Sequence, residues 1–315
     1  MTARPPILAS LGLILAFCGG AVAQELYKYQ DEDGNWIFAD KPPADGRETE
    51  SRELERAPAQ VEELVDVSHA MEGTTVLLSA RNDYFAPVEI RLEITKSRQL
   101  ELPPVDHPMA WVLPPRSETH LLQLELVASA TQPELEYQYR YLPGDPRATH
   151  APTEPYRAPF AISSDHRITQ AYPDATTHTG PDSYYAVDLA MPIGTDIVAA
   201  RDGIVFDIAS TNFRSGVDVD VDGPSANVVR ILHEDGTYAI YAHLNTNTIR
   251  VTPGDQVLRG QYIADSGNTG FSTGPHLHFA VVRNVGLRVQ SVPVTFKGRG
   301  SEDVVPSSGN LLTAY

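Results

Sequence analysis

The chain has 315 residues and a formal net charge of −17, because 41 Asp and Glu outnumber 24 Lys and Arg. This length is enough for two or three compact domains. An acidic chain without clusters of Lys and Arg is a poor candidate for binding nucleic acid or an anionic membrane surface, so both classes of partner are excluded.

Residues 1–23 predict a signal peptide. An apolar stretch over residues 7–17 follows a positively charged residue, and Ala21-Val22-Ala23 is the small-x-small pattern that precedes cleavage. The apolar stretch is too short to span a bilayer as a helix. A lipoprotein anchored at Cys18 is the alternative, but bulky Phe17 stands where such signals place a small residue. We therefore expect cleavage after Ala23, which leaves an exported chain without cysteine and without disulfides.

Residues 24–45 predict a small β-hairpin module. Aromatic runs at residues 26–30 and 35–38 flank an Asp-Gly pair, which is typical of a hairpin turn. This run resembles a small uncharacterised module common at the front of Gram-negative envelope proteins, and the resemblance implies no activity. Residues 46–70 are rich in Arg and Glu and predict a charged linker.

Residues 71–160 predict an immunoglobulin-like β-sandwich. Apolar and polar residues alternate in three runs, and proline-containing turns separate them, which is typical of short antiparallel strands. The alternating side chains expected on the core face are Ile90, Leu92 and Ile94, then Leu122, Leu124 and Leu126, then Tyr137, Tyr139 and Tyr141. The histidines in and beside this region (His69, His107, His120 and His150) are scattered, so we predict no chemistry here.

Residues 161–300 predict a second, compact antiparallel-β domain, followed by a C-terminal tail at residues 301–315. A glycine-rich stretch near its end leads into His276-Leu277-His278. In a β-strand alternate side chains share a face, so His276 and His278 point the same way. Two such imidazoles suit a metal, or a metal and the substrate that it activates. A pair of surface histidines is the alternative, which this motif alone leaves open.

Two further motifs precede that stretch. His178 and Asp188 lie ahead of a predicted strand and turn. Residues 228–233 and 238–243 predict a hairpin closed by Glu234-Asp235-Gly236, with His243 at the end of its second strand.

In this order His178 and Asp188, Tyr241-Ala242-His243-Leu244 and Gly-Pro-His-Leu-His-Phe at residues 274–279 resemble the lysostaphin/LytM-type zinc peptidases of the cell wall. The resemblance covers about residues 165–297. It implies a β fold with zinc (Zn2+) at the floor of a groove, and hydrolysis of peptide cross-links in peptidoglycan. It also implies zinc ligation by His178, Asp188 and His278, and catalytic roles for His243 and His276.

The expected chemistry is consistent with those roles. Three protein ligands leave one tetrahedral position free, as in catalytic zinc sites. The chain has no His-Glu-x-x-His motif, so a histidine beside the metal has to handle protons. We assign the general base to His276 and transition-state stabilisation to His243, and an exchange of these roles stays open. The Gram-negative type of N-terminal module favours the D-Ala–diaminopimelate cross-link and a periplasmic location.

The spacing departs from the family pattern. Nine residues separate His178 from Asp188, whereas relatives have a shorter spacing. We interpret the extra residues as an inserted loop that carries Tyr184 and Tyr185. His166 is the alternative first ligand.

Asp218, Asp220 and Asp222 copy the first half of a calcium-binding loop. The acidic residue expected at the last loop position is replaced by Val229. A solvated acidic loop is therefore favoured over a calcium site.

Two other functions compete. The domain could be a non-catalytic LytM-type regulator that activates a cell-wall amidase, but all five site positions are filled. The glycine pattern also resembles lipoyl and biotinyl carrier domains, yet no lysine lies between Ser163 and Thr295. We expect peptidoglycan peptide stems as the partner, without stable membrane insertion, and leave a regulatory or cell-division partner open. We also hypothesise that the N-terminal domains restrain the site.

Overall fold

The computed structural model describes residues 24–30, 34, 36–39, 42–43, 46–54, 63–104, 109–127, 133–300 and 302–315. The expected signal peptide and His107 lie outside the described residues. Two compact units are present: residues 61–146 with 286–288, and residues 147–285 with 289–315, the second also taking in residues 21–60. Within the described part of the chain, no helix is long and apolar enough to cross a membrane.

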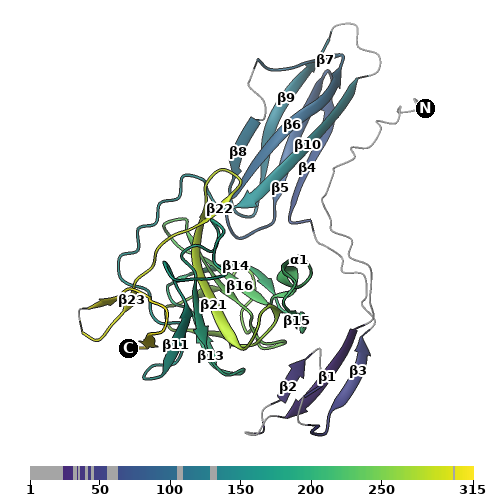
Figure 1. Ribbon diagram of the computed structural model, residues 1–315. Coiled ribbons are helices and arrows are strands. Elements are labelled where there is room, and N and C mark those ends of the chain that lie inside the picture. The colour runs from purple at the N-terminus through teal and green to yellow at the C-terminus, as the bar shows by residue number, and fades with distance from the viewer. Residues whose placement is uncertain are drawn as a thin grey trace. The chain divides into compact units, whose positions relative to one another are not determined.

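The N-terminal segment is a three-stranded antiparallel sheet (Figure 1). Its strands β1 (Gln24–Gln30) and β2 (Trp36–Ala39) form the expected hairpin. A third strand, β3 (Glu50–Leu54), pairs with the other edge of β1. Residues 50–54, expected to be part of a charged linker, therefore form an edge strand. Charged residues are well suited to such an exposed position. Lys28 and Glu50, for example, form a cross-strand ion pair of 3.3 Å.

The unit of residues 61–146 has two antiparallel sheets around one core, visible in the upper part of Figure 1. One sheet has the order β4-β5-β9-β7 and the other β10-β6-β8. The strands are β4 (Val65–Glu72), β5 (Thr75–Asn82), β6 (Val88–Arg98), β7 (Leu100–Glu101), β8 (Met109–Leu113), β9 (Ser117–Leu126) and β10 (Glu134–Pro143). β4 begins inside the range expected as linker. The immunoglobulin-like topology stays a prediction.

The predicted alternation is confirmed on β6 and partly wrong on β9. Ile90 and Leu92 are fully buried. On β9 the pairing with β5 shifts register, because Leu78 lies opposite Leu122 but Ser79 lies opposite His120. Leu121, which falls at this shift, turns into the core with Leu124. A β-bulge adds one residue to a strand and reverses which side chains face inward.

The unit that begins at residue 147 is built on a sheet of order β18-β14-β16-β17-β21-β12-β11-β25, with β22 also pairing with β21. The strands are β11 (Asp165–Gln170), β12 (Val187–Ala190), β14 (Gly203–Ala209), β16 (Val228–Leu232), β17 (Tyr238–Ala242), β18 (Gln256–Val257), β21 (His276–Asn284), β22 (Val289–Ser291) and β25 (Leu311–Thr313). Both predicted features of this sheet, the hairpin of β16 with β17 and the His-x-His strand, are confirmed.

Three small pairs complete this unit. They are β13 (Asp196–Val198) with β19 (Tyr262–Asp265), β15 (Ser215–Gly216) with β20 (Gly270–Phe271), and β23 (Phe296–Lys297) with β24 (Asp303–Val304). The short helices α1 (Val219–Asp222) and η1 (Gly223–Ser225) follow β15.

The ends of this unit differ from the expected boundaries. Tyr156 and Phe160 lie before residue 161, yet they are 1% and 0% exposed within its core. The backbone of Tyr156 also pairs with that of Phe296. At the other end, the expected tail contains β25, which pairs with β11 and buries Leu312. In both places the burial of apolar side chains in the core stabilises the fold.

Candidate metal centre

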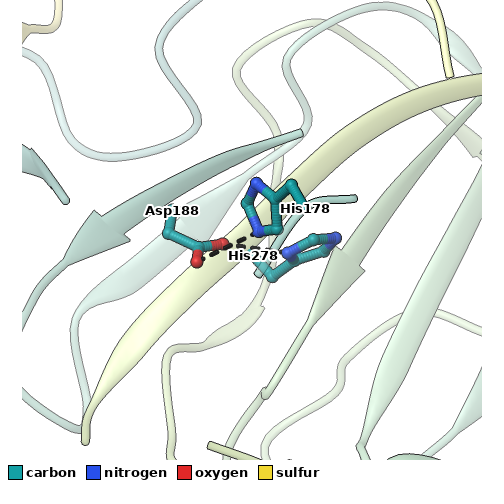
Figure 2. A group of neighbouring side chains, drawn as sticks. All are labelled: His178, Asp188 and His278. Atoms are coloured by element: carbon teal, nitrogen blue, oxygen red, sulfur yellow. Dashed lines mark hydrogen bonds and ion pairs between the residues drawn. The ribbon is translucent and has the colours of Figure 1, made fainter. Parts of the chain in front are cut away.

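Three side chains from neighbouring strands and one loop converge at one place. Asp188 on β12 lies directly opposite His278 on β21 in the antiparallel register. His178 comes from the loop that joins β11 to β12, and Figure 2 shows its ring turned toward the Asp188 carboxylate. One nitrogen or oxygen of each residue lies within 4.8 Å of the other two. In the described residues this is the one group of His, Cys, Asp or Glu with such a spacing.

The contacts within this group define which atoms face inward. Nε2 of His178 is 3.2 Å from Oδ2 of Asp188, and Nδ1 of His278 is 2.9 Å from Oδ1. The two imidazole rings stand edge to face, with centroids 5.0 Å apart. Nδ1 of His178 lies 3.2 Å from the carbonyl oxygen of Ala186. Because a carbonyl can only accept, Nδ1 carries a proton and Nε2 is the atom directed at the group.

Asp188 is the electrostatic centre of this group. It is 4% exposed, and burial alone would raise the pKa of its carboxyl. Hydrogen bonds and charge interactions with His178 and His278 outweigh burial and hold this pKa well below its usual value. The side chain is therefore an anion, which is the form that a cation requires.

His243 and His276 stand beside the group. Their ring centroids are 4.5 Å apart, and His243 lies 5.9 Å from the ring of His278. Nε2 of His276 is 3.9 Å from Oδ2 of Asp188. Nδ1 of His243 lies 2.7 Å from the carbonyl oxygen of Thr269, and Nδ1 of His276 lies 2.8 Å from that of Gly274. In both rings this places the proton on Nδ1 and leaves the lone pair on Nε2.

His243 occupies an unusual backbone position. It follows the last residue of β17 and has a φ of 63°, in the left-handed region that non-glycine residues seldom adopt. Burial, reinforced by the nearby rings of His276 and His278, lowers the pKa of His243 to about 3. The ring is therefore neutral near pH 7. Strained backbone of this kind is concentrated at functional sites.

Other residues named from the sequence lie elsewhere. His166, the alternative ligand, packs edge-on against Phe160 at 4.6 Å and does not belong to the group. Tyr184 and Tyr185 lie between His178 and Asp188, and their rings contact each other and Tyr172 with centroids 4.9 to 5.1 Å apart. That this segment is an insertion stays a prediction.

The predicted solvated acidic loop is wrong for one of its members. Asp222 is 2% exposed, and its Oδ1 accepts from Nε of Arg214 at 2.7 Å. Asp218 caps α1 by accepting from the backbone of Asp220 and Val221. Two of the three carboxylates thus already bond to other groups of the protein. Asp222 requires such a partner because it is buried.

Gln170, whose Nε2 donates to Oδ2 of Asp188 at 2.7 Å, was not predicted from the sequence. Its position carries no local signal, because a register shift pairs Ile168 with Leu189 but Gln170 with Asp188. The period of two along β11 is therefore broken between Ile168 and Gln170. The carbonyls of Thr269 and Gly274 gave no such signal, because every residue has one.

Residues 182–291 match the model of peptidase family M23, and residues 13–63 match that of a domain of unknown function, DUF4124. The M23 match begins after His178, so that histidine is placed in the group by the structure.

The chain is 36% identical to glycyl-glycine endopeptidase ALE-1 of Staphylococcus capitis over 103 residues, covering 32% of this chain and 25% of that protein. It is 34% identical to peptidoglycan DD-endopeptidase ShyA of Vibrio cholerae over 128 residues, covering 41% and 26%. The match thus spans about a quarter of the length of these relatives. The crystal structure of a mutant catalytic domain of the M23 protein EnpA from Enterococcus faecalis is 30% identical, with a TM-score of 0.32, covering 42% of this chain and 92% of that domain. This chain carries a domain of peptidase family M23, preceded by a DUF4124 module.

Proposed function

We propose that the chain is an exported, periplasmic zinc endopeptidase that hydrolyses peptide cross-links of peptidoglycan. The observation that carries this proposal is the convergence of His178, Asp188 and His278 beside His243 and His276, within a domain of family M23. Two relatives are named as endopeptidases, and ShyA is named as acting on peptidoglycan. The five positions that a catalytic site of this type needs hold His178, Asp188, His243, His276 and His278.

The donor set fits zinc. Two imidazole nitrogens and one carboxylate oxygen are ligands that zinc prefers, and three protein ligands leave a position for substrate or water. Ala186 fixes the His178 ring, as outer partners of zinc-bound histidines commonly do. When bound, zinc supplies a Lewis acid that polarises a peptide carbonyl and acidifies a water molecule.

The remaining histidines supply proton transfer. With Nδ1 held by the carbonyl of Gly274, His276 directs the lone pair of Nε2 toward Asp188, where it can take a proton from the attacking water. The same nitrogen can then protonate the leaving amine. His243, held through Nδ1 by the carbonyl of Thr269, faces His276. Its neutral Nε2 carries a lone pair, so it stabilises the transition state by accepting a hydrogen bond from the attacking water. The two carbonyls keep both rings in the tautomer that this chemistry requires.

We further propose the D-Ala–diaminopimelate bond as the scissile bond. The name DD-endopeptidase for ShyA supports this choice. So does the DUF4124 module, which we associate with Gram-negative envelope proteins.

The decisive experiment incubates residues 24–315 with sacculi of the diaminopimelate type and identifies the released muropeptides by mass spectrometry. We expect cross-linked dimers to be converted to monomers, with loss of activity on zinc chelation and in His276→Ala. The matched control is His120→Ala, because His120 is an exposed histidine on β9. Intact dimers with a folded, zinc-loaded protein would contradict hydrolysis and favour the role of an amidase regulator.

A further inference from the structure

We propose that Gln170 is a positioning residue that joins Asp188 and the His178 loop into one preformed metal site. This inference rests on the proposed function, since it assigns His178 and Asp188 to the same metal. Gln170 is the last residue of β11 and lies opposite Asp188 on β12. A register shift between Ile168 and Gln170 separates it from the regular part of the strand pair.

One end of the Gln170 side chain holds the metal-facing carboxylate. Nε2 donates to Oδ2 of Asp188 at 2.7 Å, while Oδ1 of the same carboxylate faces Nδ1 of His278 at 2.9 Å. Both oxygens thus have a fixed partner, and the carboxylate cannot rotate freely. The partner is a neutral amide, so it orients Asp188 without the positive charge of Arg or Lys, which would repel a metal cation.

The other end of the side chain holds the loop that carries His178. Oε1 accepts from the backbone N–H of Thr176 at 2.9 Å and of Thr177 at 3.0 Å. The hydroxyls of the same two threonines lie 2.9 and 3.1 Å from Oε1. Bonds from two consecutive backbone groups fix the chain direction immediately before His178.

The length of the segment between His178 and Asp188 makes this bridge important. Nine residues separate His178 from Asp188, so the covalent path between these two ligands is long and constrains them weakly. Gln170 offers a much shorter connection, through one side chain from a strand already paired with β12. Ligands that are held before the metal arrives lose less conformational entropy when it binds. We therefore expect Gln170 to contribute to zinc affinity.

The test measures zinc affinity of residues 24–315 by competition with a chromophoric chelator. Gln170→Met keeps the size of the side chain and removes every hydrogen bond. Gln170→Asn keeps the amide but is one methylene too short to bridge Thr176–Thr177 and Asp188, and it serves if the Met variant fails to fold. Gln256→Met is the matched control, because Gln256 is exposed on the edge strand β18.

We expect both Gln170 variants to bind zinc about 10- to 100-fold more weakly, which is the usual effect of losing an outer partner of a ligand. The control should bind as the parent does. Excess zinc should restore hydrolysis of sacculi by Gln170→Met. The circular dichroism of this variant without zinc should match that of the parent, which excludes a damaged fold as the cause.

Two further outcomes separate this inference from the proposed function. Unchanged zinc affinity in both folded Gln170 variants, with loss of affinity in His278→Ala, would overturn the role of Gln170 alone. If the parent chain and His278→Ala bind zinc equally, or neither binds it, the metal site itself is wrong and the inference falls with it.

Discussion

Asp188 and His278 lie directly opposite each other on two antiparallel strands, with Oδ1 of the first 2.9 Å from Nδ1 of the second. Both side chains are therefore positioned by backbone hydrogen bonds of the central sheet. His178, in contrast, depends on the conformation of a loop. Two of the three proposed ligands should keep their places when that loop moves.

Asp188→Asn should separate charge from shape at this site. The amide has nearly the size of the carboxylate but lacks the negative charge that a cation needs. We expect zinc affinity to fall by more than about 100-fold, a larger loss than for an outer partner. Equilibrium dialysis against zinc checks this, with Asp174→Asn as a control at an exposed position. A variant that retains stoichiometric zinc would show that Asp188 is not a ligand.

Asn227 should matter for the strained turn at His243. This fully buried side chain donates to the carbonyls of Asn212 at 2.6 Å and Leu244 at 3.2 Å, and accepts from the N–H of Asn212 at 2.8 Å. Asn227→Ala removes the partner of the Asn212 N–H, at about 1–3 kcal/mol, whereas the two carbonyls still accept from the hydroxyls of Thr246 and Thr269. We expect a lower unfolding temperature together with reduced hydrolysis. An unfolding temperature equal to that of the parent would contradict this assignment.

Stability should fall in mild acid because of His233. Burial lowers the pKa of this histidine to about 4 from 6.5. The unfolded chain therefore binds the proton more readily, so the stabilising contribution is complete above pH 6.5 and is lost as the pH falls toward 4. The full effect is on the order of 3 kcal/mol.

Urea unfolding between pH 4 and 7 measures this effect. His233→Asn is the informative comparison, because its amide can still donate to the carbonyl of Asp202, which accepts from Nδ1 at 2.8 Å in the parent. The difference in stability between the two proteins should shrink as the pH decreases. A difference independent of pH would assign the acid sensitivity to other groups, such as His150 or Asp235.

The unit that begins at residue 147 should require the residues just before position 161 to fold. Tyr156 and Phe160 are buried in its core, and deletion of one large buried aromatic side chain costs about 3–5 kcal/mol. We expect residues 147–315 to unfold cooperatively and residues 161–315 to be unfolded or to melt at a much lower temperature. Circular dichroism on heating checks this, and equal melting temperatures would place the boundary later.

The N-terminal domains are expected to restrain hydrolysis. Residues 147–315 should then release muropeptides faster than residues 24–315 at equal zinc occupancy. Addition of separately produced residues 24–146 tests whether the restraint requires a covalent link. Equal rates for the two proteins would remove the idea of restraint.

How far the sequence predicts this molecule depends on whether a feature is local. The period of two that places His276 and His278 on one face is a local property of a strand, and the hairpin before His243 follows from its turn residues. The bulge at Leu121, the pairing of β3 and the entry of β25 into the main sheet depend on distant partners. These partners are distant in the sequence, so the strand propensity of nearby residues could not indicate them.

The same distinction applies to the site. Sequence motifs predict the five histidine and aspartate positions, and the structure brings these five side chains together. The number of residues between His178 and Asp188 could not indicate whether the two side chains meet. Gln170 could not be predicted either, because its contacts join three segments of the chain.

Strand β21 presents Leu277 and Phe279, both fully buried, on one face and the two histidines on the other. A slip of one residue would carry His276 and His278 into the core and turn Leu277 toward the candidate metal centre. The apolar packing of this strand therefore encodes the alignment of the histidines as well as the stability of the fold. A cavity made by Leu277→Ala should broaden the distribution of histidine positions, and metal binding should weaken at temperatures well below global unfolding.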